Sequence, residues 1–172
     1  MVVGPSLGCY PALAHAATRP NVAKGSGVLN TGPGFRDAEK REAWNIRSRR
    51  NAHRFPVPEV ATNLNLQHDS VVMEHLGEMH VPTLILVGGD DRPEYFSGGQ
   101  YMERKMPNAH MVVVDGGGHA MHEDSPATEL ADLLHKFVVG LHSRSRLCYR
   151  VCVLLVLPPT MSPTTHPTAA SA

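Results

Sequence analysis

Two short apolar runs, each closed by glycine residues, constrain the fold of this chain more than any other feature. Residues 83–87 read Thr-Leu-Ile-Leu-Val and precede two glycines, and residues 111–114 read Met-Val-Val-Val and precede Asp-Gly-Gly-Gly. Continuous apolar runs of this length are typical of strands buried on both faces, as in a parallel sheet. Both segments are therefore predicted to be buried parallel strands.

The other segments alternate between short apolar pieces and longer helical patterns. The expected strands lie at 1–4 and 25–30, and the expected helices at 7–18, 37–50, 69–76 and 95–106. A last helix begins at Ser125 and Pro126, the residue types preferred at an N-cap and at the first helical position. This alternation predicts an α/β protein, a parallel sheet with helices on both faces. Residues at about 35–80 are expected to form a short helical insert.

The composition excludes several classes of function. The chain has 172 residues and a formal net charge of +0, so no overall field favours nucleic acid or an anionic membrane surface. The apolar run at 147–157 contains Arg150 and is shorter than the ~18 residues that a membrane span requires. The N-terminus shows no secretory signal. The three cysteines are too few and too badly spaced for a disulfide framework or a zinc site. A reducing, cytoplasmic location is therefore expected. The sequence indicates no oligomeric state.

The amino-acid composition of the chain changes after Gly140. Residues 158–172 are mostly Pro, Thr, Ser and Ala, which bury too little apolar surface to offset the entropy of ordering. The sequence therefore divides into a domain at 1–140 and a largely disordered tail at 141–172.

Chemically useful side chains follow the predicted strands. Residues 4–8, Gly-Pro-Ser-Leu-Gly, fit the G-x-S-x-G turn that exposes a serine between a strand and a helix. Asp90 and Asp91 follow another strand, and His119 follows the last one. The carboxyl ends of parallel strands share one edge of a sheet, so these groups are expected to meet there. A serine needs an imidazole to accept its proton, and the imidazole needs a carboxylate to fix its tautomer.

Three segments together resemble the α/β-hydrolase-fold serine hydrolases. They are VVGPSLGCYPALAHAATRPNVAKGSGVLNTGPGF, which resembles the nucleophile elbow, its helix and the next strand; VPTLILVGGDDRPEYF, the acid-bearing strand and turn; and MVVVDGGGHAMHEDSP, the histidine loop. The likeness covers residues 2 to about 139. A lone G-x-S-x-G is a weak signal, whereas three matches in the family's chain order are fairly specific.

The resemblance assigns a role to each matching residue. It implies Ser6 as the nucleophile, His119 as the general base and Asp91 as the acid, with Asp90 as the alternative acid. The backbone N–H of Leu7 would supply one oxyanion donor. Asn30, Gly32 and Trp44 are expected to line the substrate pocket. The implied reaction is hydrolysis of an ester or other acyl compound, a small-molecule substrate, through an acyl-enzyme and with no cofactor.

The chain also departs from the family pattern. The family normally has four or more strands before the elbow, and a loop among them carries the second oxyanion donor. The chain thus looks like the C-terminal portion of the family fold, from an incomplete gene model or a shortened isoform, with its elbow strand at a sheet edge. Loss of one oxyanion donor costs on the order of 3 kcal/mol in the transition state. The alternative function is that of an inactive fragment acting as an interaction module.

Two other patterns are expected to have no special chemistry. His119 and His122 suggest a metal pair, but no third ligand is indicated and no metal site is predicted. The basic stretch at 47–50, together with Arg54, is predicted to be the solvated face of the helix at 37–50 rather than a site for nucleic acid or another anion. In that helix Ala43, Trp44 and Ile46 are the apolar members.

Overall fold

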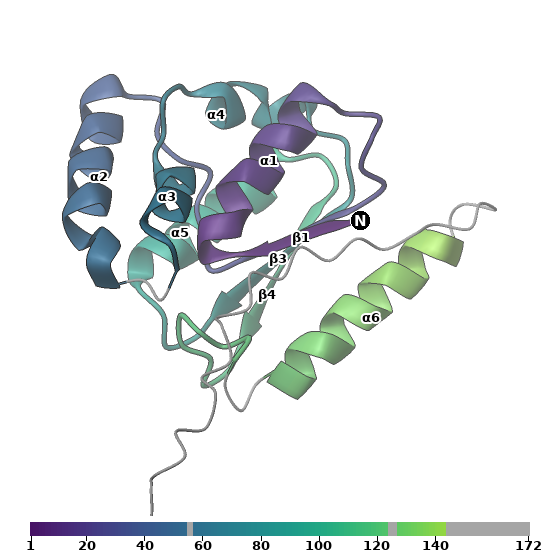
Figure 1. Ribbon diagram of the computed structural model, residues 1–172. Coiled ribbons are helices and arrows are strands. Elements are labelled where there is room, and N and C mark those ends of the chain that lie inside the picture. Colours follow the sequence, from purple (N-terminus) through teal and green to yellow (C-terminus); the bar gives the residue numbers. More distant parts are fainter. Residues whose placement is uncertain (55–56, 124–126, 144–172) are drawn as a thin grey trace, which may run out of the picture.

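The computed structural model describes residues 1–54, 57–123 and 127–143 (Figure 1). Four parallel strands form one sheet in the order β1-β2-β3-β4. Their bounds are Val2–Pro5 for β1, Ser26–Leu29 for β2, Thr83–Gly88 for β3 and Ala109–Val114 for β4. The predicted parallel sheet is therefore confirmed.

Helices cover both faces of this sheet, as the sequence predicts. They are α1 (Cys9–Thr18), α2 (Ala38–Asn51), α3 (Glu59–Thr62), α4 (Val71–His75), α5 (Pro93–Lys105) and α6 (Ala127–Ser143), with 3-10 turns at η1 (Ser6–Gly8), η2 (Ala52–Arg54), η3 (Asn63–Asn65) and η4 (Leu76–Glu78). Figure 1 shows α6 on the opposite side of the sheet from α1. One apolar core joins α1, α4 and α5 to the sheet, and a second lies beneath α6. The insert between β2 and β3 contains α2, α3 and α4.

The two apolar runs form neighbouring strands with different burial. Every residue of β3 is buried, because β3 pairs with β2 and β4 and its two faces belong to the two apolar cores, Ile85 and Val87 to one and Leu84 and Leu86 to the other. The prediction that β4 is equally buried is wrong: β4 is an edge strand, His110 is exposed and Val113 is 39% exposed. Only Val114, at the end of β4 near the site described below, is fully covered.

Helix α2 is attached to the molecule mainly through polar contacts. Its start is as expected, because the Asp37 side chain accepts a hydrogen bond from the Lys40 N–H at 2.9 Å. Its apolar members are not its buried face, since Ile46 is 57% exposed. The Asn45 side chain instead donates to the Gln67 carbonyl at 2.9 Å and accepts from the Gln67 N–H at 2.8 Å. An apolar periodicity therefore misjudges which side of α2 faces inward.

The strand that precedes the serine lies at an edge. Residues of β1 pair with β2, and no other described strand pairs with β1, which agrees with the expected edge position. Among the described residues no helix is both long and apolar enough to cross a membrane. The predicted helix start at 125–126, the apolar run at 147–157 and the expected disorder of the tail lie outside the described residues.

Cys9 anchors the start of α1 against the sheet. Its thiol is fully buried, accepts a hydrogen bond from the Leu29 N–H at 3.1 Å and also contacts the Gly4 carbonyl oxygen. Burial raises the pKa of the Cys9 thiol to about 12, although the contact with the Leu29 backbone lowers it. The helix that follows the serine is thereby fixed to both β1 and β2.

Cys9 is accordingly expected not to react with thiol reagents in the folded chain. With a pKa of about 12, on the order of one thiol in 10⁴ is ionised near pH 8, and the thiolate is the reactive form. The test is the rate of labelling by a chromogenic disulfide reagent in a variant with Cys148→Ser and Cys152→Ser, folded and in urea. Rapid labelling without denaturant would contradict the burial of this thiol.

Candidate active site

The sharp turn between β1 and α1 presents Ser6. The backbone of Ser6 has φ of +41°, the left-handed region that a non-glycine residue rarely adopts and that costs on the order of 1–3 kcal/mol. Gly4 makes the turn possible, because a Cβ at this position would lie 2.5 Å from the Gly8 carbonyl oxygen. Both features are typical of a strained strand-to-helix elbow that exposes a nucleophile.

Hydrogen bonds connect Ser6, His119 and Asp91 in one chain of contacts. The Oγ of Ser6 lies 2.7 Å from Nε2 of His119, and Nδ1 of His119 lies 2.8 Å from Oδ2 of Asp91. One neutral tautomer of His119 satisfies both contacts: Nδ1–H donates to the carboxylate and Nε2 accepts from the hydroxyl. The three residues follow β1, β3 and β4, so the parallel sheet brings them together.

The structure also distinguishes between the two candidate acids. The Asp91 side chain is 3% exposed, and its other oxygen accepts a hydrogen bond from the Arg92 N–H at 2.7 Å. The Asp90 side chain is exposed. The backbone N–H of Asp90 donates a hydrogen bond to the Gly117 carbonyl at 2.9 Å, in the loop that carries His119. The carboxylate in contact with His119 is therefore that of Asp91.

Asn30 holds the histidine loop rather than lining a cavity. It is 1% exposed, and its amide nitrogen donates to the carbonyl oxygens of Gly118 at 3.0 Å and of His119 at 2.9 Å. Its amide oxygen accepts from the Gly88 N–H at 2.8 Å. The expectation that Asn30 borders the pocket thus differs from its observed position: both polar atoms of its side chain join the ends of β2 and β3 to the loop. Asn30 has φ of +51°, which asparagine tolerates better than most residues.

Tyr95 is a site residue that the sequence analysis missed. Its ring stacks on the His119 imidazole, with 4.9 Å between the centroids and 28° between the planes. Burial raises the pKa of Tyr95. It lies in the first turns of α5, in a segment expected only to be helical, and no local pattern marks it as a partner of His119.

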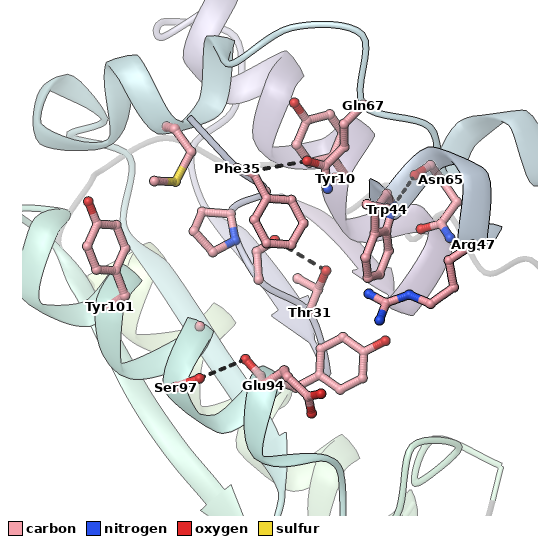
Figure 2. A pocket seen from close by; sticks show the side chains of 16 residues that line it. Tyr10, Thr31, Phe35, Trp44, Arg47, Asn65, Gln67, Glu94, Ser97 and Tyr101 are labelled. Carbon is pink, nitrogen blue, oxygen red and sulfur yellow. Dashed lines mark hydrogen bonds between the residues drawn. The ribbon is translucent and has the colours of Figure 1, made fainter. Parts of the chain in front are cut away.

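Two adjoining cavities open beside the serine and the imidazole. The smaller, of about 240 Å³, is lined by Ser6, Leu7 and His119 among others, and the larger, of about 370 Å³, is mostly aromatic and aliphatic. Figure 2 shows the larger cavity, with Trp44 and Arg47 on one side and Tyr101 on the other. The two cavities are adjacent, because Trp44 and Tyr95 line both of them. Gly32 lines the larger one as well, and that Gly32 and Trp44 border a substrate stays a prediction.

The histidine pair has other partners. In His119, Nε2 contacts Ser6 and Nδ1 contacts Asp91. In His122, Nε2 lies 3.3 Å from the Glu123 carboxylate. The described part of the chain contains no group of three His, Cys, Asp or Glu side chains that could hold a metal ion.

A sequence model of the alpha/beta hydrolase family matches residues 2–133, which is more than half of the chain. This chain belongs to the alpha/beta hydrolase family. The match includes the turn at Ser6, the turn at Asp91 and the loop that carries His119. A search of curated proteins by sequence finds no match.

Solved structures of other alpha/beta hydrolases have the same fold. A carboxylesterase from the thaumarchaeon Nitrososphaera gargenis aligns with a TM-score of 0.64 and 16% identity, over 83% of this chain and 65% of its own. MenH from S. aureus aligns with a TM-score of 0.60 and 17% identity, over 84% and 68%. MGS-M2, an alpha/beta hydrolase from a deep-sea metagenome library of the Medee basin, aligns with a TM-score of 0.55 and 21% identity, over 87% and 66%. The chain therefore spans about two thirds of the length of these structures, and at such identities they show the fold alone.

Replacing Gly4 with alanine should destabilise the folded chain far more than replacing Gly8 with alanine. The new methyl group at position 4 would meet backbone atoms that cannot move aside, a cost of about 1–3 kcal/mol. Gly8 is the matched control, because its nearest neighbour would be 3.8 Å from the new Cβ and its backbone is helical, with φ −77° and ψ −15°. The measurement is the free energy of unfolding in urea, and equal values for the two variants would contradict the close approach at Gly4.

Proposed function

We propose that this chain hydrolyses an ester or a related acyl compound through Ser6, His119 and Asp91. The observation that carries the proposal is the unbroken set of contacts from the Ser6 hydroxyl to His119 and on to the Asp91 carboxylate. Such contacts provide a nucleophile, a base within reach of its proton and a carboxylate that orients the base.

The proposed reaction proceeds in two halves. The Oγ of Ser6 forms a bond to the acyl carbon while its proton moves to Nε2 of His119. The bond from the acyl carbon to the leaving oxygen then breaks, and that oxygen takes the proton from His119. In the second half a water molecule gives a proton to His119 and its oxygen bonds to the acyl carbon. Ser6 departs with the proton, and the free acid is released.

The backbone around the elbow supports stabilisation of the negative charge. The N–H of the residue after the nucleophile is the usual first oxyanion donor in this geometry, and Leu7 lines the same cavity as Ser6 and His119. Leu7 is accordingly proposed as one donor. Each such donor contributes on the order of 3 kcal/mol to transition-state stabilisation.

The kind of nucleophile narrows the substrate class. A serine at the elbow argues against the branches of the family that use aspartate there, which are the epoxide hydrolases and haloalkane dehalogenases. Esters, thioesters and carbon–carbon bonds next to a carbonyl remain compatible with Ser6. Since the chain spans about two thirds of the length of the solved structures it matches, the activity of the whole protein is part of this proposal.

The direct test is covalent labelling by a fluorophosphonate probe. The unmodified chain should be labelled at Ser6, because the base in contact with its hydroxyl makes the serine nucleophilic. A Ser6→Ala variant of unchanged circular dichroism should not be labelled. Labelling that persists in Ser6→Ala, or its absence from well-folded unmodified chain, would refute the proposed nucleophile.

The two neighbouring aspartates provide a matched pair of variants. Asp91→Asn should lower kcat on a 4-nitrophenyl ester by on the order of 10⁴-fold, because the amide cannot hold His119 in the required tautomer. Asp90→Asn should stay within about twofold of the unmodified chain, since the Asp90 side chain is exposed and does not contact His119. Similar losses in both variants would contradict the assignment of Asp91.

The second candidate is a non-catalytic interaction module, and the sheet edge favours it. One side of β1 has no described partner strand, and an apolar cavity of about 440 Å³ lies between β1 and α6. An unpaired edge strand is a site where another chain can add a strand. A folded chain that no phosphonate labels would support this candidate over the hydrolase.

A further inference from the structure

The cavity around Ser6 and His119 is lined by three arginines and no acid. Arg47 lies in α2, Arg54 lies in the 3-10 turn η2 that extends α2, and Arg92 directly precedes α5. Asn51, one turn of α2 beyond Arg47, lines the same cavity. One side of α2 and its extension therefore lines this cavity. Arg47 and Arg54 are also solvent-exposed, as the sequence predicts.

These three guanidinium groups have no carboxylate partner within the part of the chain that the structure describes. Arg47 lies over the ring of Trp44, 5.0 Å from its centroid, a cation–π contact that orients the side chain without neutralising it. Arg49, on another side of α2, differs in that it pairs with Glu42 at 3.5 Å. Figure 2 shows Arg47 extending beneath Trp44 at the margin of the larger cavity.

The positive charges lie next to the catalytic groups. Tyr95 stacks on His119, and the guanidinium groups of Arg92 and Arg47 both act to lower its pKa, against the larger effect of burial. Two carboxylates act on Tyr95 in the opposite sense: Asp91 is already bonded to His119 and to a backbone N–H, and Glu94 lines the adjoining cavity but not this one. Three uncompensated like charges around one cavity repel one another, and an anion between them would relieve that repulsion and accept charged hydrogen bonds.

We propose that the substrate carries an anionic group, a carboxylate or a phosphate, which Arg47, Arg54 and Arg92 hold beside the acyl carbon that Ser6 attacks. This inference rests on the proposed function and specifies its substrate class. The rest of the substrate is apolar and occupies the adjoining cavity of about 370 Å³, whose walls include Phe35, Trp44 and Met73. The substrates are thus acyl compounds with one charged and one apolar end.

Binding can be followed without turnover, because Trp44 is the single tryptophan of the chain and lines both cavities. The experiment titrates the unmodified chain with hexanoate, hexyl phosphate and the uncharged hexanamide while recording tryptophan fluorescence. At least one anion should bind about tenfold more tightly than hexanamide, the factor of one charged hydrogen bond. The ratio of the two anions distinguishes a carboxylate from a phosphate site. Equal binding of all three compounds would overturn the proposal.

Variants locate the effect at the arginines. Arg54→Gln and Arg92→Gln should each reduce the preference for the anion over hexanamide several-fold, and added salt should reduce it in the unmodified chain because these groups are exposed. Arg50→Gln is the matched control: it removes the same charge from α2, but Arg50 lines neither cavity. An equal loss in Arg50→Gln would mean a general charge effect and would overturn the assignment.

A pair of substrates separates failure of this inference from failure of the proposed function. Mono-4-nitrophenyl glutarate has a free, charged distal carboxylate, and in its methyl ester that group is uncharged. Cleavage of both with equal kcat/KM would support the hydrolase and overturn the anion site. Cleavage of neither, with no labelling of Ser6, would refute the hydrolase, and the fluorescence titration would then decide the anion site alone.

Discussion

Parallel pairing of four strands is the constraint on which the candidate site depends. The register aligns Pro5 with Leu29, Leu29 with Leu86, and Gly88 with Val114, so the strands reach one edge of the sheet together. Ser6 and His119, 113 residues apart in the chain, are thereby brought within hydrogen-bond distance. Each neighbouring strand has to keep its register, because a shift by one residue would reverse which side chains face the core.

Polar contacts at the strand ends then fix the loops. Ser6 and Asn30 both have positive φ angles where β1 and β2 end, so local backbone strain is concentrated at this edge. The contacts of Asn30 with Gly88, Gly118 and His119 stabilise the loop that carries the imidazole. The ring of Tyr95 stacks on one face of the His119 imidazole and restricts the movement of the imidazole toward that side. Hydrogen bonding and stacking thus hold His119 in a position that the sheet alone only approximates.

The insert contributes chemistry through its polar side. Helix α2 is fixed through Asn45 and the indole of Trp44, which donates to the Asn65 carbonyl at 2.8 Å, rather than through an apolar face. This attachment leaves Trp44 and Arg47 at the cavities. The sheet thus brings Ser6, Asp91 and His119 to one edge, and the insert adds Trp44 and Arg47 to the cavities beside them.

The sequence by itself determined the parallel α/β sheet, because the glycine-closed apolar runs and the strand-to-helix turn at Ser6 are local patterns. It also placed Ser6, Asp91 and His119 at strand ends, since the order of elements along a chain decides which loops share an edge. It left Asp90 open as an alternative acid, overestimated the burial of β4, placed Asn30 at the pocket, and did not show that Arg47 lies beside the serine. Those choices depend on which partner lies across space from each side chain. Only the packed structure, in which segments far apart in the chain compete for the same neighbours, decided them.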